Sequence, residues 1–421
     1  MAGGRGTRSS NPAIPKSLQL ILGKTIIEWQ LEKIARDISA KVWVIGGFKG
    51  QSLQDYLLTI SHKFPNLSIE YLQDYELNGT LKALYRFSHL IEGNEFAILL
   101  GDVIINFDWQ LFFDNLREKD VDALIVTHPN NHPEDSDVLI DSQFDSELMV
   151  LPKKRRSSDF DGNQVFAGIY GIKRNILQIP LKDGSDLADL FCKEIFEKYR
   201  VRNYISVDYI KDSGTKSRIL EIENDILFGN FENRNPVNRS IIFVDFDNTL
   251  HKNIEVKKND TEINLNPFIV NSLRKINKIG IPIVVITNQP GVAKNLFSLN
   301  DLEIFFRRIQ SELAKESCFI DAWYFCPHHP EKGWPGENID LKIDCNCRKP
   351  KVGLIEKFAK TNTFSPSISW FVGDSLRDKE LALSAGLNFI HSRVDEDELN
   401  NFRSTSSVLS NLAEILTHDN L

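Results

Sequence analysis

Three cysteines and a histidine lie close enough in the sequence to form one metal site. The segment Cys326-Pro-His328-His329 is followed by Cys345-Asn-Cys347, with sixteen residues between His328 and Cys345. Three thiols and an imidazole at this spacing can complete the tetrahedral coordination that zinc prefers. The chain has five cysteines in 421 residues, which is too few for a disulfide scaffold. The sequence therefore predicts a zinc site that closes a long loop.

A second group consists of carboxylates that follow apolar runs. Asp245 and Asp247 end the run that begins at Ile241, and Asp374 follows the run at 368–372. Ligands bind at the carboxyl ends of strands in open α/β sheets. Two carboxylates this close repel each other unless a cation joins them, so we expect Mg²⁺ here. Asp378 is either a carboxylate at the start of a helix or a group that supports the metal.

Groups that can hold a phosphoryl group accompany these carboxylates. Thr287 and Asn288 follow the apolar run at 281–286 and offer a hydroxyl and an amide. Lys349 comes two residues after the last thiol and supplies a cation. Fixed positive charge and hydrogen-bond donors stabilise the charge that develops during phosphoryl transfer. The carboxy-terminal half is therefore predicted to carry out phosphate chemistry.

The composition is that of a globular protein with two domains. A chain of 421 residues is about twice the usual single-domain size, and 42% of its residues are hydrophobic. The net charge of −8 argues against a nucleic-acid partner, because such proteins usually carry a basic face. No apolar run approaches the roughly 18 to 20 residues that span a bilayer, and no secretory signal is seen. We therefore expect a cytosolic protein with neither a nucleic-acid nor a membrane partner.

Strand-like and helix-like segments alternate along both halves. In the first half, strands are predicted at 41–45, 68–72, 95–100 and 122–126, with helices such as 26–38 and 80–91. In the second half, strands are predicted at 240–246, 281–286, 322–325 and 368–372, and helices at 265–279, 300–316, 351–360 and 377–385. The segment 229–239 is rich in Asn and Pro and is predicted to be a linker. The pattern indicates two doubly wound α/β domains with parallel sheets, over residues 1–230 and 240–421.

The motifs of the second half resemble the haloacid dehalogenase superfamily, whose members cleave phosphate esters through an aspartyl-phosphate. All four signature regions occur here in order. The resemblance implies that Asp245 is the nucleophile and that Asp247 protonates the leaving alkoxide and then activates water. It also implies that Thr287 and Lys349 hold the phosphoryl group. Mg²⁺ would be bound by Asp245, the backbone carbonyl of Asp247, and Asp374.

The metal motif narrows this resemblance. Cys-Pro-His-His-Pro, Cys-x-Cys-Arg-Lys-Pro and Thr-Asn-Gln-x-Gly resemble the D-glycero-D-manno-heptose 1,7-bisphosphate phosphatases and, less closely, the histidinol-phosphate phosphatases. The first of these families implies that the loop presents Arg348 to the sugar phosphate and that His329 lies outside the metal shell. It also implies the zinc ligands Cys326, His328, Cys345 and Cys347. Two positions depart from the family, because Asn248 replaces a glycine and Ser375 replaces a lysine.

The amino-terminal half resembles the sugar-1-phosphate nucleotidyltransferases. Its opening, Ala-Gly3-Gly4-Arg-Gly-Thr-Arg8, matches the glycine-rich loop of that family and is followed by Pro15-Lys16. Without β-carbons, such a loop brings backbone amides close to phosphate oxygens. The resemblance implies that Gly3, Gly4, Arg8 and Lys16 bind a nucleoside triphosphate.

Further landmarks of this family follow in order. Gly79 lies in the turn that would bind the base and sugar, and Gly168 lies in a segment that would contact the sugar. Asp102 and Asp212 would share Mg²⁺. The basic run at 153–155 either meets the sugar phosphate or is a solvated surface. In the family the glycine loop follows a buried strand. We therefore expect either that a strand of about five to seven residues is encoded upstream of Met1, which is the preferred alternative, or that the sheet lacks a central strand and the domain is compromised.

Together the motifs predict a bifunctional enzyme of heptose activation that uses Mg²⁺ and Zn²⁺. The phosphatase would remove the 7-phosphate of D-glycero-D-manno-heptose 1,7-bisphosphate, and the other domain would join the heptose 1-phosphate to a nucleotide. Its partners would be small sugar phosphates and a nucleoside triphosphate. Two alternatives remain open. The phosphatase could act on histidinol phosphate or another small phosphate, and the amino-terminal domain could be an inactive binding module.

Overall fold

The computed structural model describes residues 1–2, 14–130, 138–141, 148–151, 164–178, 186–191, 193–251, 263, 265, 267–392 and 398–418. The chain divides into two compact units. The first contains Met1–Thr127, Leu148–Val150 and Phe166–Glu232, and the second contains His128–Glu147, Leu151–Val165 and Asn233–Leu421. The last division lies within the predicted linker, and the domain limits at 230 and 240 remain predictions. Among the described residues, no helix is long and apolar enough to cross a membrane.

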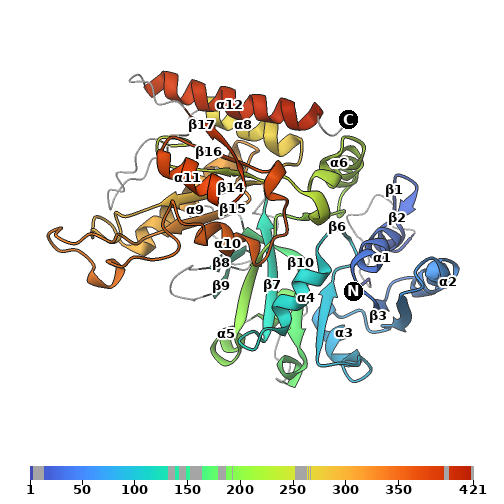
Figure 1. The fold of residues 1–421 in the computed structure, drawn as a ribbon. Helices are drawn as coiled ribbons and strands as arrows, with labels where there is room; N and C mark the ends of the chain where they lie inside the picture. Colours follow the sequence, from blue (N-terminus) through green and yellow to red (C-terminus); the bar gives the residue numbers. More distant parts are fainter. Residues whose placement is uncertain are drawn as a thin grey trace. The chain divides into compact units, whose positions relative to one another are not determined.

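The first half of the chain forms short strands joined by helices (Figure 1). Its strands are β1 (Leu20–Ile21), β2 (Lys24–Thr25), β3 (Ala40–Gly46), β4 (Leu67–Gln73), β5 (Glu95–Leu99), β6 (Val103–Asn106), β7 (Ala123–Pro129), β8 (Val138–Asp141), β9 (Leu148–Leu151), β10 (Gln164–Lys173), β11 (Val201–Ile205) and β12 (Tyr209–Asp212). Its α-helices are α1 (Ile26–Asp37), α2 (Gly50–Ile60), α3 (Thr80–Phe87), α4 (Trp109–Arg117), α5 (Lys193–Lys198), α6 (Lys216–Leu227) and α7 (Asn230–Asn233). Short 3₁₀ helices include η1 (Lys16–Leu18) and η6 (Leu187–Leu190). The strands and helices predicted here from the sequence are confirmed.

The sheets of the first unit are mixed. β3 pairs with β4 in parallel, and β11 pairs with β7 in parallel. In contrast, β10 pairs with β5 in antiparallel orientation, and β12 pairs with β6 in antiparallel orientation. The α/β class is confirmed, and the predicted parallel pairing is found for β3 with β4 and β7 with β11 but not for β5 with β10 or β6 with β12. Apolar periodicity predicts that a strand forms, whereas the direction of its neighbour depends on the path of the chain between them.

A cavity of about 430 Å³ lies between β3 and β5. Its walls include Val42 and Val44 of β3, Phe96 and Ile98 of β5, and Leu31 of α1. At one end, the Met1 amino group donates a hydrogen bond to the Leu99 carbonyl (2.8 Å), and the Ala2 N–H donates to the Ile45 carbonyl (2.7 Å). Ala2 thus bridges to β3 as a strand residue would. Leu84 of α3 and Trp109 and Phe113 of α4 also line the cavity, so its walls are two strands and side chains of three helices.

The second unit contains a parallel sheet of five strands in the order β15-β14-β13-β16-β17. The strands are β13 (Ile242–Val244), β14 (Ile283–Asn288), β15 (Ala322–Cys326), β16 (Trp370–Gly373) and β17 (Asn388–His391). The helices are α8 (Pro267–Lys278), α9 (Leu299–Lys315), α10 (Gly353–Ala359), α11 (Leu376–Ser384) and α12 (Glu398–His418). The parallel sheet and the predicted elements are confirmed here. β17 and α12 were not predicted.

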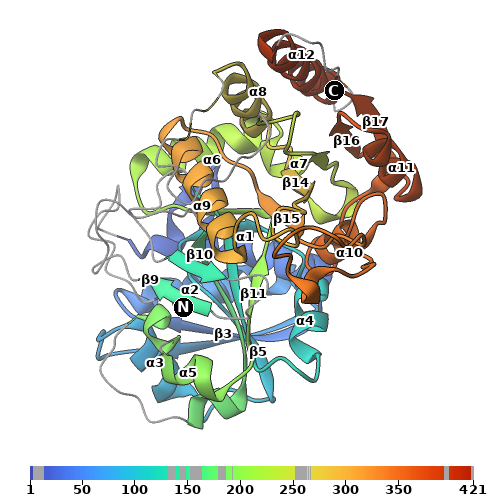
Figure 2. The same cartoon turned by 90° about the vertical axis from the view of Figure 1, so that its left-hand side faces the viewer.

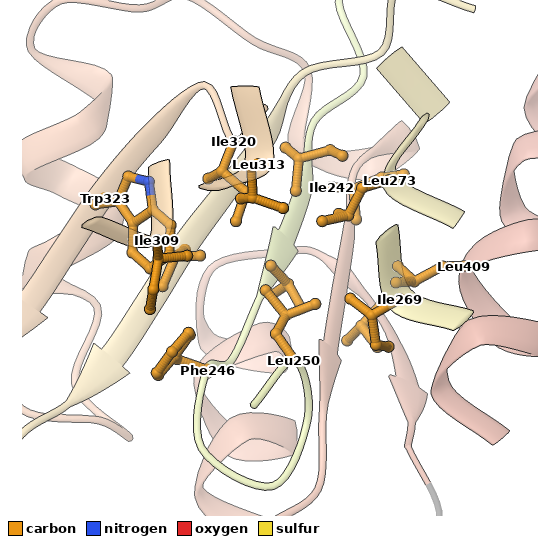
Figure 3. Close-up of a cluster of buried hydrophobic side chains, with 14 of the residues drawn as sticks. Ile242, Phe246, Leu250, Ile269, Leu273, Ile309, Leu313, Ile320, Trp323 and Leu409 are labelled. Carbon is orange, nitrogen blue, oxygen red and sulfur yellow. The ribbon is translucent and has the colours of Figure 1, made fainter. Parts of the chain in front are cut away.

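Helices cover both faces of this sheet. On one face, Ile242 and Val244 of β13 pack with side chains of α8, α9 and α12. Figure 3 shows Ile269 of α8 close to Leu409 of α12, and Ile309 of α9 beside Trp323 of β15. Phe243 points to the opposite face and meets Phe358 of α10 with ring centroids 5.3 Å apart. This alternation follows from the two-residue period of a strand.

The last helices complete the second unit. α12 lies along α8, and α11 lies against β16 and β17, in both views (Figures 1 and 2). The burial of Leu409 and Leu412 against α8 and the sheet explains why a segment with a weak apolar pattern forms a helix. The carboxyl ends of β13, β14 and β16 therefore lie side by side at one edge of a sheet with both faces covered.

Candidate active sites

Lys349 joins two buried carboxylates at the carboxyl end of β13. Its Nζ lies 2.7 Å from Asp245 Oδ1 and 2.7 Å from Asp378 Oδ1. All three residues are buried. Burial alone disfavours the charged ammonium, but the two carboxylates outweigh it and raise the pKa of Lys349. The lysine therefore brings a fixed positive charge to the position of Asp245.

Asp245, Asp374 and Asp378 offer three carboxylate oxygens that all lie within 4.8 Å of one another. Burial, with a further contribution from Asp378, raises the pKa of Asp245 to about 7 despite the opposing effect of Lys349. Burial also raises the pKa of Asp374. Like charges held this close favour a cation, and hard oxygens are the ligands that Mg²⁺ takes. The residues present fit a magnesium ion.

Asp247, the second carboxylate of the motif, is held by an amide. Gln289 Nε2 donates a hydrogen bond to Asp247 Oδ2 at 2.7 Å and to Thr287 Oγ1 at 3.2 Å. The next residue, Asn248, has a φ of 58°, in the left-handed region. Asparagine enters this region more readily than most residues, which explains how it can replace the usual glycine.

Asn288 connects the end of β14 to Lys349. Its Nδ2 donates to the Lys349 carbonyl at 3.2 Å, and its Oδ1 accepts from the Lys349 N–H at 3.0 Å. Ser375, the other departure from the family, caps α11, because it accepts from the Asp378 N–H and donates to Asp378 Oδ2. Asp378 therefore lies in the capping box of α11, as one alternative predicted, and it also binds Lys349, whereas its support of a metal stays a prediction.

Cys326, His328, Cys345 and Cys347 form the second possible metal centre, with their ligand atoms within 4.8 Å of one another. Cys326 Sγ lies 3.5 Å from Cys345 Sγ, and His328 Nδ1 lies 3.2 Å from Cys347 Sγ. A zinc tetrahedron with ordinary bond lengths has edges of about 3.4 to 3.8 Å. A hydrogen bond from Cys326, with support from His328, lowers the pKa of Cys347 to about 4, despite partial burial. The residues fit a zinc ion.

Side chains within the loop between these ligands contact one another. His329 lies outside the ligand group, and its ring meets the Trp334 ring with centroids 4.8 Å apart. Lys342 Nζ lies 3.9 Å from the centre of the Trp334 ring and 3.0 Å from Glu337 Oε2. Arg348 Nη1 donates to the His328 carbonyl at 3.1 Å. Arg348 is therefore positioned by the backbone of a zinc-ligand candidate.

The first unit contains a separate polar cluster. Lys16 Nζ lies 2.8 Å from Asp102 Oδ2. Arg218 Nη1 lies 2.6 Å and 2.7 Å from the two oxygens of Asp212. The Ser213 N–H donates to the Asp102 carbonyl at 2.8 Å, which holds the two aspartates at the same end of the β6–β12 pair. The structure therefore brings together Lys16, Asp102 and Asp212.

The structure describes two of the four glycines predicted to bind substrate in the first unit, Gly79 and Gly168. Gly79 has a φ of 118° and is the N-cap residue before α3. Gly168 has a φ of 75°, and its carbonyl accepts from the Leu100 N–H at 3.0 Å. These conformations favour glycine. A β-carbon at Gly168 would also lie 3.1 Å from a methyl group of Val103. Gly3, Gly4 and Arg8, and the basic run at 153–155, lie outside the described residues.

Two residues gain a role that the sequence did not settle. The sequence contains Gln289 in the Thr-Asn-Gln motif and predicts no role for it, whereas the structure shows that it binds Asp247. The sequence leaves two roles open for Asp378, and the structure adds an ion pair with Lys349. The Thr-Asn-Gln motif was the available signal for Gln289. For Asp378, the signal was its place three residues after Ser375, the spacing of a capping box.

Comparisons with known proteins agree with this organisation. The family model described as nucleotidyl transferase matches residues 1–227, and the model described as polynucleotide kinase 3 phosphatase matches residues 240–398. The D-glycero-beta-D-manno-heptose-1,7-bisphosphate 7-phosphatase of Rhodopseudomonas palustris is 34% identical over 149 residues, which cover 35% of this chain and 81% of that protein.

Two further matches are similar in part. The histidine biosynthesis bifunctional protein HisB of Legionella pneumophila is 30% identical over 155 residues, which cover 36% of this chain but only 41% of that protein. A solved D,D-heptose 1.7-bisphosphate phosphatase from B. bronchiseptica, complexed with magnesium and phosphate, has a TM-score of 0.34 and 25% identity, covering 43% of this chain and 99% of that chain. Through residues 1–227 the chain belongs to the nucleotidyl transferase family, and through its relationship to the Rhodopseudomonas protein it also belongs to the D-glycero-beta-D-manno-heptose-1,7-bisphosphate 7-phosphatase family.

Proposed function

We propose that the protein is a bifunctional enzyme of heptose activation that acts in the cytosol. Its second half would remove the 7-phosphate of D-glycero-D-manno-heptose 1,7-bisphosphate, and its first half would transfer a nucleotidyl group to the remaining 1-phosphate. The observation that carries the proposal is the buried group of Asp245, Lys349 and Asp378, with the Cys326–Cys347 metal centre ending two residues before Lys349. The Rhodopseudomonas relative supports the choice of substrate.

We assign the phosphatase step to the residues around Asp245, and the position of Lys349 beside this carboxylate supports the assignment. A carboxylate oxygen of Asp245 attacks the phosphorus, the bond from phosphorus to the sugar oxygen breaks, and Asp247 gives a proton to that oxygen. Asp247 then takes a proton from water as the water oxygen attacks the phosphorus. The bond to Asp245 breaks and inorganic phosphate leaves. Lys349 and Thr287 hold the phosphoryl oxygens, and Asn288 fixes the backbone of Lys349.

Two metals accompany this site. Asp245, Asp374 and the Asp247 backbone carbonyl would hold Mg²⁺, with Asp378 beside them. Bound magnesium supplies positive charge to the phosphoryl oxygens and favours the ionised form of Asp245. Cys326, His328, Cys345 and Cys347 would hold Zn²⁺, which fixes the loop that presents Arg348 to the sugar phosphate.

The nucleotidyl transfer is assigned to the first unit. An oxygen of the sugar 1-phosphate attacks the α-phosphorus of the nucleoside triphosphate, the bond between the α-phosphorus and the bridging oxygen breaks, and pyrophosphate leaves. Lys16, with Gly3, Gly4 and Arg8, would bind the triphosphate, and Gly79 and Gly168 would contact the nucleoside and sugar. Asp102 and Asp212 would bind Mg²⁺, and the short distance from Lys16 to Asp102 supports this placement.

A phosphate-release screen tests the phosphatase assignment. Purified protein with Mg²⁺ is given heptose 1,7-bisphosphate, heptose 7-phosphate and histidinol phosphate, with the Asp245→Asn variant as control. We expect the bisphosphate to have the highest kcat/KM and the variant to lose at least about 10³-fold, the scale seen when a nucleophile is removed. Comparable turnover by Asp245→Asn would contradict the covalent mechanism.

The same screen decides between two substrates. Histidinol phosphate is the second candidate because the metal motif also resembles the histidinol-phosphate phosphatases, and a similar share of this chain matches a protein of histidine biosynthesis. A higher kcat/KM for histidinol phosphate than for the heptose bisphosphate would replace the heptose assignment while leaving the phosphatase chemistry intact.

A further inference from the structure

We propose that Gln289 is a positioning residue that orients the general acid Asp247 and ties it to the zinc loop. The proposal rests on the phosphatase function given above. Gln289 is almost completely buried, with 3% of its surface exposed. Its Nε2 donates to Asp247 Oδ2 at 2.7 Å and lies 3.2 Å from Thr287 Oγ1. The amide therefore contacts the predicted acid directly.

The backbone of Gln289 is fixed by a zinc-ligand candidate. Its N–H donates to the carbonyl of Cys326 at 2.7 Å, directly after the pairing of Asn288 with Cys326 between β14 and β15. Cys326 Sγ in turn lies 3.5 Å from Cys345 Sγ. A movement of Cys326 would therefore be transmitted through one hydrogen bond to Gln289 and through a second to Asp247.

The zinc loop also holds the turn that follows Gln289. The Asn338 N–H donates to the Ala293 carbonyl at 3.0 Å. Lys294 Nζ lies 4.4 Å from the centre of the Trp334 ring. The segment that carries Gln289 is thus attached to the loop between the zinc-ligand candidates at two places. One is Gln289 itself, through Cys326, and the other is the pair Ala293 and Lys294. These attachments hold the backbone at Gln289, and the hydrogen bonds to Asp247 and Thr287 hold its amide, which reduces the entropy that must be lost in the transition state.

The hydrogen bond has a defined chemical consequence. The Oδ2 atom of Asp247 accepts a hydrogen bond from Gln289, so a proton on this oxygen would point at another hydrogen. The protonated form of Asp247 therefore carries its proton on Oδ1, which can give it to the leaving group. A fixed proton position matters most when the leaving oxygen is a strongly basic alkoxide. A p-nitrophenolate is a weak base and can leave without receiving a proton. Loss of Gln289 should therefore lower the rate of cleavage of alkyl phosphate esters more than that of nitrophenyl phosphate esters.

The test uses Gln289→Met, which keeps the length of the side chain but removes the donor. The value of kcat/KM is measured because it reports the steps up to departure of the leaving group and excludes hydrolysis of the aspartyl-phosphate. We expect kcat/KM to fall by about 10²-fold for the sugar phosphate and by less than about 3-fold for p-nitrophenyl phosphate. Gln310→Met on α9 is the matched control, and neither substrate should be affected there.

Zinc content and thermal melting are measured on both variants to show that fold and metal loop persist. Equal losses on the two substrates in Gln289→Met would overturn the proposal, because Gln289 would then act on the phosphoryl group or on the fold. An unchanged kcat/KM for the sugar phosphate would overturn it as well. Failure of the proposed function would be seen separately, in the unmodified protein, as an absence of phosphate release from both substrates.

Discussion

At the scale of single residues, the nucleophile candidate is placed where it reduces stability. Asp245 is buried beside Asp378, and burial is the main reason that its pKa rises to about 7. In the unfolded chain the same carboxyl group ionises near its ordinary pKa of 3.8. The folded state therefore binds a proton that the unfolded state releases across this range. Positions of this kind exchange stability for reactivity.

This linkage predicts a pH-dependent difference for Asp245→Asn. As the pH rises from about 4 to about 7, the unmodified protein should lose up to about 4 kcal/mol of stability that the variant keeps. Below about pH 4 both forms are neutral at this position and should be similar. Melting temperatures of both proteins, measured across this range without added Mg²⁺, check the prediction. A constant difference at every pH would show that ionisation of Asp245 is not the cause.

At the scale of elements, the loop from Cys326 to Cys347 contacts the phosphatase site as well as holding the candidate zinc ligands. Cys347 is followed by Arg348 and Lys349, whose Nζ binds Asp245, and Cys326 holds the backbone of Gln289. The loop thus reaches the catalytic group from both of its ends. Loss of the metal should disturb groups that contact the leaving sugar more than the buried carboxylates, which the sheet holds.

We expect Cys347→Ser to lose zinc and to lower activity by about 10-fold or more on the sugar bisphosphate, with a smaller effect on an aryl phosphate. The physical reason is that Arg348 and the loop meet the sugar, whereas Lys349 is also held by Asn288. Metal analysis and kcat/KM on both substrates test this, with Cys318→Ser as the control because Cys318 is buried outside the ligand group. Equal losses on both substrates would mean that the metal supports the whole unit.

A second prediction at this scale concerns the cavity between β3 and β5. Fusing an apolar, β-branched segment of about six residues before Met1 should fill the space of about 430 Å³ and pair with both strand edges. It would also remove the buried amino group of Met1, whose pKa burial lowers to about 6. We expect the melting temperature of the first unit to rise by at least about 5 °C.

Calorimetry on the full chain measures this effect, and a Gly-Ser segment of the same length is the control. The control also removes the Met1 amino group but has no apolar surface to bury, so it should raise the melting temperature less than the apolar segment does. If both segments raise the melting temperature equally, removal of the terminal charge is the cause and filling of the cavity is not.

At the scale of the whole molecule, one chain carries two separate clusters for phosphate chemistry. The Asp102 cluster belongs to the nucleotidyl transferase match, and the Asp245 cluster belongs to the phosphatase match. The proposed product of the second reaction centre is the proposed substrate of the first. A mutation in one cluster should therefore leave the chemistry of the other cluster intact, while the phosphatase reaction must precede the nucleotidyl transfer.

Given heptose 1,7-bisphosphate, Mg²⁺ and a nucleoside triphosphate, the protein should release phosphate first and pyrophosphate afterwards. Asp245→Asn should lose both products, because no heptose 1-phosphate forms. Asp102→Asn should lose pyrophosphate and keep phosphate release. A time course of both products with each triphosphate in turn checks this order. Undiminished pyrophosphate from Asp245→Asn would contradict it.

The sequence alone determined most of the strands and helices that carry the candidate site residues, and the residue types that these sites contain. Strand and helix periods are local properties, so β13, β14 and β16 could be predicted within a few residues, and their carboxyl ends carry Asp245, Thr287 and Asp374. The four zinc-ligand candidates were also recognisable, because they lie in two short motifs.

Tertiary structure decided what depends on contacts between distant segments. The antiparallel pairing of β10 with β5 is set by the chain path, and α12 is a helix because its apolar side chains find α8. The double role of Asp378 arises only when Lys349, far away in the sequence, approaches it. Likewise, Gln289 meets Asp247 only after β13 and β14 pair in register. Local patterns specify elements and residue types, whereas hydrogen bonds and ion pairs between elements require the folded chain.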